Sequence, residues 1–348
     1  MLKTLHLQNF TVFPNARLEF SPGLNVLIGE NGAGKSHLLK LGYSLLNSLG
    51  SPGNRRPAKT VAERAIAQEL VGVFGAESLG RLVSRTQGNT RAGIEVTWSE
   101  DGAISLYFSG RSSERVHIDR ANYPPLPSSV LFLPPGEILS VFAGFQGAIE
   151  KRELAFDATY LSLTMALNNA PLKGKLLQET FGIIREIEAI LGAKIVKREN
   201  RFFFVSKSRG ELEAHLASIG ERKLGMLAYL LMNGEIRKDT VLFMDTPEAG
   251  LNPLLQKRLA KILVLASSCM QIVIATHSLF FLKELMILQM QKELKLAMYF
   301  GIHKSGNGSA VLQGESIEEI GDIALLDAAI AQSDRYMQLA YEEGQNTE

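Results

Sequence analysis

The chain has 348 residues, of which 46% are hydrophobic and 21% charged, and its formal net charge is +1. This balance excludes a global field that attracts nucleic acid or an acidic membrane, so any DNA contact has to come from a local patch. One cysteine excludes an intramolecular disulfide, and the six histidines form no cluster at zinc spacing. Charges interrupt the apolar stretches well short of a membrane span. We therefore expect a cytoplasmic protein that has no membrane partner.

The first elements surround a glycine-rich segment. Strands are expected at 2–10 and 17–20, and the apolar run 24–28 predicts a third. Residues 29–36 then read Gly-Glu-Asn-Gly-Ala-Gly-Lys-Ser, which fits the phosphate-binding pattern G-x-x-x-x-G-K-[ST] without a mismatch. A strand, a glycine turn and a helix start place backbone N–H groups and a helix dipole around one anion. The expected nucleotide-binding residues are Gly29, Glu30, Asn31, Gly32, Ala33, Gly34, Lys35, Ser36 and His37.

Further along the chain, the pattern changes twice. Before residue 137 we expect a helix to about Leu49, a helix at 61–74, a hairpin of 94–98 and 104–108 around Asp101-Gly102, and a strand at 129–133. Helical periodicity then dominates at 154–167 and 176–191. After a hairpin at 195–205, helices at 221–233, 254–267 and from 280 alternate with strands at 241–244 and 272–275. We therefore predict an α/β fold with parallel strands, in which a helical lobe (137–194) is inserted between two halves of a nucleotide-binding lobe (1–136 and 195–348).

Two of the later strands end in polar residues. Asp245 closes the apolar run 241–244, and a buried parallel strand that ends in Asp is the usual source of the Mg²⁺-side carboxylate in phosphate-loop ATPases. Its expected place is beside the phosphate loop, because strand ends meet at one edge of an open α/β sheet. His277 follows the next strand, and its ring is a candidate hydrogen-bond donor to the γ-phosphate. Lys35 is expected to reach the β- and γ-phosphates, and the Ser36 hydroxyl to bind Mg²⁺.

Together these segments resemble the ATP-binding-cassette (ABC) ATPases of the SMC, RecF and OLD type. The resemblance rests on residues 24–36, on 245–253 (Asp-Thr-Pro-Glu-Ala-Gly-Leu-Asn-Pro, like D-E-P-E-x-x-L-H-P) and on 275–278 (Ala-Thr-His-Ser, like the switch histidine). Residues 216–223 look like a degenerate L-S-G-G-Q signature. The resemblance implies a P-loop NTPase with two lobes and a mixed sheet, and ATP and Mg²⁺ as cofactors. It also implies a homodimer or higher oligomer, in which Ser218, Gly220 and Glu221 of one chain cap the ATP bound to another.

One position departs from the family pattern. The family usually has Glu directly after the strand-ending Asp, where it polarises the attacking water, whereas this chain has Thr246. A hydroxyl of ordinary pKa is a poor general base, so Glu248 becomes the candidate base and we expect slow hydrolysis. Glu137 occupies roughly the place of the family's Mg²⁺-sensing Gln, although a solvated loop acid fits there equally well. For Ser218, a helix cap with Glu221 in the first turn is the alternative to an ATP contact.

The sequence leaves three functions open. The first is a dimeric ATPase switch for an effector encoded by a neighbouring gene, in antiphage defence or a toxin–antitoxin module. The second is a RecF-like repair ATPase that binds DNA through patches such as Arg55, Arg56 and Lys59, or Arg81, Arg85 and Arg91. The third is a transporter engine, which the degenerate signature disfavours. The acids after His277 are not clustered at strand ends, so no OLD-type nuclease site is expected. The simpler interpretation of the basic patches and of these acids is ordinary solvated charge. Residues 320–330 have an apolar helical face, and its simpler interpretation is that it packs on its own domain.

Overall fold

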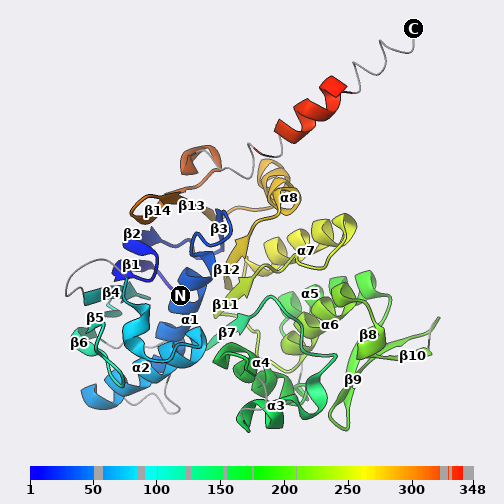
Figure 1. The fold of residues 1–348 in the computed structure, drawn as a ribbon. Coiled ribbons are helices and arrows are strands. Elements are labelled where there is room, and N and C mark those ends of the chain that lie inside the picture. Colours follow the sequence, from blue (N-terminus) through cyan, green and yellow to red (C-terminus); the bar gives the residue numbers. More distant parts are fainter. Residues whose placement is uncertain are drawn as a thin grey trace.

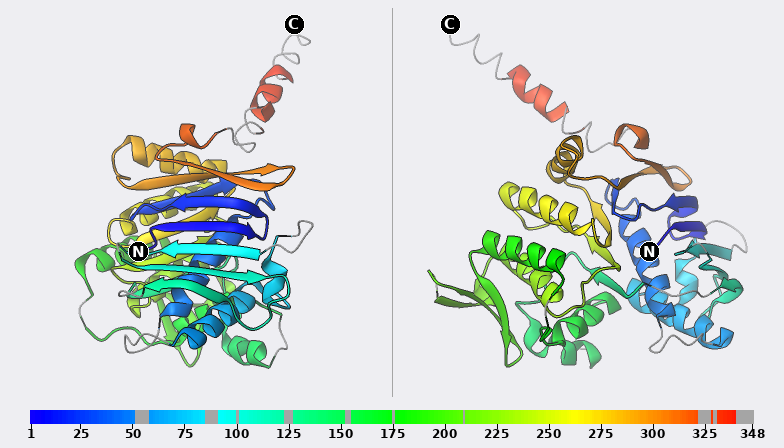
Figure 2. Two further views of the ribbon diagram at one scale, coloured as in Figure 1. Left: turned by 90° about the vertical axis from the view of Figure 1, so that its left-hand side faces the viewer. Right: turned by 180° about the vertical axis from the view of Figure 1, so that it is seen from behind.

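The computed structural model describes residues 1–50, 58–84, 91–99, 101–122, 127–151, 155–174, 176–208, 210–321, 328 and 331–339. Its first lobe is a sandwich in which one helix, α1 (Lys35–Leu49), lies between two sheets (Figure 1, Figure 2). Leu38, Leu41 and Leu45 of α1 are buried in the core between them. The helix that follows the phosphate loop is therefore held on both sides by sheet residues.

The six-stranded sheet positions the site. Its order is β14-β13-β3-β12-β11-β7, and its strands are β3 (Leu24–Gly29), β7 (Ser129–Leu133), β11 (Thr240–Asp245), β12 (Gln271–Thr276), β13 (Ala297–Ser305) and β14 (Gly308–Gly314). All neighbours pair in parallel except β14, which is antiparallel to β13, so the sheet is mixed. Every residue of β3, β11 and β12 is buried, as expected for strands covered on both faces. Gly29, Asp245 and Thr276 close these three strands at one edge of the sheet.

The five-stranded sheet is antiparallel, in the order β2-β1-β4-β5-β6. Its strands are β1 (Thr4–Phe10), β2 (Phe13–Glu19), β4 (Arg91–Thr97), β5 (Ala103–Ser109) and β6 (His117–Asn122). Helix α2 (Lys59–Phe74) and the short 3-10 helix η1 (Leu79–Leu82) cover it, and Phe10 meets Phe74 edge to face. The hairpin predicted around Asp101-Gly102 is confirmed as the connection of β4 and β5.

The second lobe carries most of the remaining helices. It contains α3 (Phe142–Glu150), α4 (Ala158–Asn168), α5 (Gln178–Leu191) and α6 (Ile219–Met232), together with η2 (Ala214–Leu216). A separate three-stranded sheet, β8 (Lys194–Arg198), β9 (Arg201–Ser206) and β10 (Gly210–Glu213), lies beside these helices (Figure 1). Helices α7 (Pro253–Ala266) and α8 (Leu279–Met290) cover the other face of the six-stranded sheet. The lobe boundaries drawn from the sequence stay a prediction.

Several details differ from the expected elements. Helix α4 begins at Ala158, where Asp157 caps it through the Thr159 N–H, and the expected start at Leu154 lies outside the described residues. Strands β6, β10, β13 and β14 were not predicted. Glu318 and Glu319 lie on a short 3-10 helix, η3 (Glu318–Ile320). The other predicted C-terminal acids and apolar residues, Asp322, Ile323, Leu325, Leu326, Asp327, Ala329 and Ile330, lie outside the described residues. Among the described residues, none of the helices is both long and apolar enough to span a membrane.

Candidate functional site

The phosphate loop connects β3 to α1 through three glycines with positive φ. These are Gly29 (φ 159°), Gly32 (φ 77°) and Gly34 (φ 102°), the last of which precedes the first turn of α1. The positive φ values of Gly32 and Gly34 fit the glycine turn of the anion-binding loop predicted from the sequence. Glu30, Asn31 and Gly32 are exposed at the tip of the loop.

Gly34 gives a first testable prediction. A Cβ atom at Gly34 would lie 2.6 Å from the Phe13 ring and 2.6 Å from Val12 Cγ2, in a backbone conformation that side chains disfavour. Gly34→Ala is expected to lower the free energy of unfolding by about 2–4 kcal/mol, measured by urea denaturation. Gly182→Ala is the matched control, because a Cβ at this α5 glycine meets nothing within 4 Å. The control is expected to gain about 0.5–1 kcal/mol. Equal effects of the two substitutions would contradict the packing described for the loop.

Lys35 is buried, and its ammonium group donates hydrogen bonds to carbonyls of its own loop. Lys35 Nζ lies 2.7 Å from Gly29 O and 2.9 Å from Glu30 O. Burial lowers the pKa of Lys35, while the carboxylates of Asp245 and Glu248 favour its charged form. The lysine therefore reaches from α1 over the concave side of the loop toward the acids at the strand ends.

Asp245 lies beside the start of α1, as predicted. Its carboxylate accepts a hydrogen bond from the Ser36 hydroxyl, and it is 6% exposed. Burial raises the pKa of Asp245, while Ser36, Lys40, Lys35 and His277 act in the opposite direction. The structure thus brings together Ser36 and Asp245, two of the three residues expected to hold Mg²⁺.

Glu248 is the second acid at this edge, and it is more buried than Asp245. It is 3% exposed, and its Oε1 accepts a 2.6 Å hydrogen bond from the Thr276 hydroxyl at the end of β12. Its Oε2 is buried and has no hydrogen-bond partner among the described residues. A buried carboxylate oxygen without a partner is costly, which marks it as an acceptor for a group that binds there.

Thr246 occupies a strained position between the two acids. Its φ is +47°, a left-handed value that is unusual for a β-branched residue and costs about 1–2 kcal/mol. Its N–H donates to Ala275 O at 2.9 Å, and its carbonyl accepts from Ala249 N at 3.1 Å. This tight turn carries the chain from Asp245 back to Glu248, so both acids face the same edge of the sheet.

His277 follows Thr276 and is exposed. A positive charge on the His277 ring would stabilise the Asp245 carboxylate, so the imidazole lies near enough to act on that acid electrostatically. The neighbouring Ser278 caps α8: its hydroxyl accepts from Phe281 N, and its own N–H donates to the Thr276 hydroxyl oxygen at 3.0 Å. His277 is therefore at the open side of the site, held between two residues with fixed hydrogen bonds.

The predicted signature residues stand at the start of α6. Ser218 caps this helix in a capping box: Glu221 N donates to Ser218 Oγ at 3.2 Å, and Ser218 N donates to Glu221 Oε2 at 2.9 Å. In the single chain, Ser218 therefore acts as a helix cap, the alternative role considered from the sequence. Ser218 is exposed, and so are its apolar neighbours Leu216 (66%) and Ile219 (49%), whereas Gly220 is buried. The exposed cap is free to meet a second molecule.

Glu137 has a different environment from the one expected for a metal ligand. Its Oε1 accepts from Arg222 Nε at 2.7 Å and from the Ser140 hydroxyl at 2.7 Å, while its Oε2 accepts from Ser140 N at 3.2 Å. The Glu137 side chain is 7% exposed and that of Arg222 14%, so this ion pair is nearly buried. Both oxygens are thus engaged within the second lobe, and we do not include Glu137 in the proposed metal site.

The site fits Mg²⁺ bound together with a nucleotide. The described residues contain no group of three or more His, Cys, Asp or Glu that could hold a metal by itself. Mg²⁺ in phosphate-transfer sites instead uses one or two side chains, with phosphate and water supplying the other ligands. The Ser36–Asp245 pair suits this arrangement, and the partnerless Glu248 Oε2 remains as an acceptor beside it.

The family comparison agrees with this geometry. Residues 24–283, well over half of the chain, match the family described as "AAA domain, putative AbiEii toxin, Type IV TA system". The chain belongs to this family. Its matched segment begins at β3 and ends in α8, so it contains the phosphate loop, the whole second lobe, Asp245, Glu248 and His277.

Two curated proteins with similar sequences point to the same class of ATPase. The DNA replication and repair protein RecF of Pediococcus pentosaceus is 28% identical over 180 residues, covering 51% of this chain and 42% of RecF. The DNA double-strand break repair Rad50 ATPase of Methanocaldococcus jannaschii is 33% identical over 70 residues, covering 20% of this chain and 7% of Rad50. The chain thus spans less than half the length of these curated relatives.

A solved structure shows the fold. The SMC head bound to the C-winged helix domain of ScpA has a TM-score of 0.56 and 13% sequence identity, covering 91% of this chain and 98% of that chain. The predicted P-loop fold of the ABC-ATPase type, with its mixed sheet, is confirmed, and so is the resemblance to ATPases of the SMC and RecF kind.

Two residues of the site were not predicted. Thr276 lay within a quoted segment, but its bond to Glu248 was not foreseen. Lys223 is the last residue of the signature-like segment, but its contact was not predicted: its Nζ lies 3.3 Å from the carbonyl oxygen of Thr246. In the sequence it is one of three consecutive charged residues, with Glu221 and Arg222, before the apolar part of α6.

Proposed function

We propose that this chain is a Mg²⁺-dependent ATPase that dimerises around two ATP molecules and thereby switches a separately encoded effector. One observation carries the proposal. The phosphate loop, Asp245 and Glu248 meet at a single edge of the six-stranded sheet, while the capped start of α6 with Ser218 stays exposed. The first set suits binding and hydrolysis of a nucleotide, and the second offers helix N–H groups to a phosphate on another molecule.

Each residue has a task in this scheme. The loop N–H groups and Lys35 bind the β- and γ-phosphates, Ser36 and Asp245 hold the metal, and bound Mg²⁺ neutralises charge on the phosphate oxygens. Glu248 Oε2 accepts a proton from the attacking water, since Oε1 is already committed to Thr276. The His277 ring donates a hydrogen bond to the γ-phosphate.

We propose that turnover is slow. The side chain directly after Asp245 is the Thr246 hydroxyl, which does not accept a proton from water at neutral pH. Glu248 takes that role from a fixed, buried position, three residues after Asp245. Slow hydrolysis prolongs the ATP-bound dimer, which suits a switch better than a motor.

The signature role of Ser218 is testable without removing the helix cap. Asp and Asn cap helices as well as Ser does, but Asp places a negative charge where the partner's γ-phosphate would lie. With a non-hydrolysable ATP analogue, we expect Ser218→Asp to weaken dimerisation at least about tenfold by sedimentation, because like charges repel at the interface. Ser218→Asn is the matched control and is expected to dimerise like the unchanged protein. Equal dimerisation of both variants would place the start of α6 away from the triphosphate and refute the sandwich.

The family description, "putative AbiEii toxin, Type IV TA system", supports a proposal for the biological setting. We infer an effector or antidote protein encoded by a neighbouring gene, in toxin–antitoxin or antiphage function. Co-expression of that gene with a tagged copy of this chain tests the idea. Co-purification that depends on ATP supports a nucleotide-controlled partner, whereas its absence with and without ATP argues against one.

A RecF-like DNA-binding ATPase is the second candidate, favoured by the 28% identity to RecF over 180 residues. The described part of the expected basic patches gives it little support. Arg81 pairs with Glu77 at 2.7 Å, and Arg91 stacks over Tyr107. Arg55, Arg56 and Arg85 lie outside the described residues. DNA affinity that ATP increases and that falls steeply with salt would favour this candidate.

A further inference from the structure

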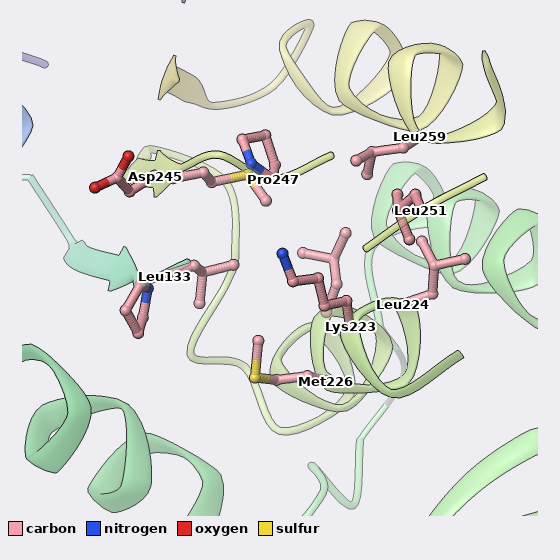
Figure 3. Close-up of a pocket in the computed structure, with 11 residues that line it drawn as sticks. Leu133, Lys223, Leu224, Met226, Asp245, Pro247, Leu251 and Leu259 are labelled. Carbon is pink, nitrogen blue, oxygen red and sulfur yellow. The ribbon is translucent and has the colours of Figure 1, made fainter. Parts of the chain in front are cut away.

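Lys223 connects the helix that carries the signature to the turn that carries the acids. The side chain leaves α6 and extends toward the turn of Asp245 and Pro247 (Figure 3). Its Nζ donates to Thr246 O at 3.3 Å. It lines a cavity of about 30 Å³ together with Leu133, Asp245, Pro247 and Leu251. Lys223 is half-buried, so nearby protein groups as well as solvent stabilise the charge of its ammonium group.

The charges around Lys223 form a balanced set. Burial lowers the pKa of Lys223, while the carboxylates of Glu248, Glu137 and Asp245 favour its charged form. Glu137 is already paired with Arg222. Two lysines, Lys35 and Lys223, therefore face two carboxylates, Asp245 and Glu248, and each lobe contributes one of these lysines. Lys40, which pairs with Asp157 at 2.7 Å, also acts on Asp245.

Close backbone packing reinforces the same connection. A Cβ at Gly220 would lie 2.9 Å from Leu251 and 3.0 Å from Leu255, and a Cβ at Gly250 would lie 2.8 Å from Ile219. The start of α6 therefore lies directly against the segment that follows Glu248. A shift of that segment has to move the exposed cap of α6, since the contact leaves no space to absorb it.

We propose that Lys223 is a positioning residue that holds the Thr246–Glu248 turn against α6 and so links the loading of the nucleotide site to the dimer face of the same chain. The inference rests on the proposed function. Mg²⁺ and Lys223 are both cations at the same acids, so metal binding weakens the hold of Lys223 on the turn. The start of α6, with Ser218, then moves relative to the sheet.

The test replaces Lys223 by Met, which keeps the length of the side chain and removes its charge. In the nucleotide-free Lys223→Met protein, amides 219–224, 246 and 248–250 are expected to exchange hydrogen at least about tenfold faster than in the unchanged protein. The Mg²⁺ concentration for half-maximal ATP binding is expected to fall at least about fivefold, because a competing cation is gone. Lys223→Arg retains the charge and is expected to restore the Mg²⁺ dependence.

Lys261→Met is the matched control, because it removes one exposed positive charge from α7. It is expected to change neither measurement. Unchanged exchange in nucleotide-free Lys223→Met would overturn the inference, and so would an Mg²⁺ dependence that Lys223→Met leaves as it was. If the unchanged protein does not dimerise with ATP, sedimentation shows this separately. The exchange result does not depend on dimerisation, because it is measured on nucleotide-free proteins.

Discussion

Replacing Lys35 with alanine is expected to lower the affinity for ATP at least about 100-fold. Lys35 Nζ now donates to the carbonyl oxygens of Gly29 and Glu30, at 2.7 and 2.9 Å. In the nucleotide complex, the same donors turn to phosphate oxygens, and charge-assisted hydrogen bonds of this kind contribute about 1.5–3 kcal/mol each. Two of them account for a change of this size. Isothermal titration calorimetry with a non-hydrolysable ATP analogue measures it.

Lys304→Ala is the matched control for the charge beside the loop. Lys304 Nζ pairs with Glu30 at 3.6 Å, and its side chain is 46% exposed, so solvent and salt screen it. Its loss is expected to reduce the affinity less than about fivefold, and less still at high salt. If the two substitutions lowered the ATP affinity equally, the overall positive charge near the loop, rather than direct hydrogen bonds from Lys35, would be responsible for binding.

The phosphate loop and Asp245 were predictable because their signals are local. Eight consecutive residues and their flanks define the loop, and fully apolar runs are typical of parallel strands buried on both faces. Since such strands end at one edge, the distance in sequence between Ser36 and Asp245 did not matter. The cap of α6 was equally local, because Ser218 and Glu221 have the spacing of a capping box.

The parts that were missed depend on tertiary packing or on a turn signal that was overlooked. Thr276 meets Glu248 across 28 residues, and no local pattern indicates that pair. Lys223 reaches Thr246 only because Gly220 allows α6 to approach the Leu251 segment. Strands β13 and β14 did have a signal, since the two residues 306–307, Gly-Asn, join them as a tight hairpin. The place of β13 beside β3, with β14 at the edge, follows from the sheet order, which the sequence does not specify.

Glu248→Gln is expected to reduce ATP hydrolysis at least about 100-fold while ATP affinity stays within about threefold. Gln keeps the shape of Glu and an amide oxygen that accepts from the Thr276 hydroxyl, so the turn is expected to stay in place. It replaces the partnerless oxygen, Oε2, by a group that accepts no proton. Phosphate release under single-turnover conditions measures the rate, and sedimentation in ATP is expected to show a longer-lived dimer.

Thr246→Ala separates the two candidates for the catalytic position. The Thr246 hydroxyl belongs to a strained residue whose backbone groups hold the turn, and alanine keeps those backbone bonds while removing the hydroxyl. We expect hydrolysis to fall less than about tenfold, because a hydroxyl only orients water whereas a carboxylate also takes its proton. The reverse ranking, with rapid turnover that survives Glu248→Gln and is lost in Thr246→Ala, would assign activation of water to the residue directly after Asp245. Glu248 would then act through its bond to Thr276, by fixing the end of β12 next to His277.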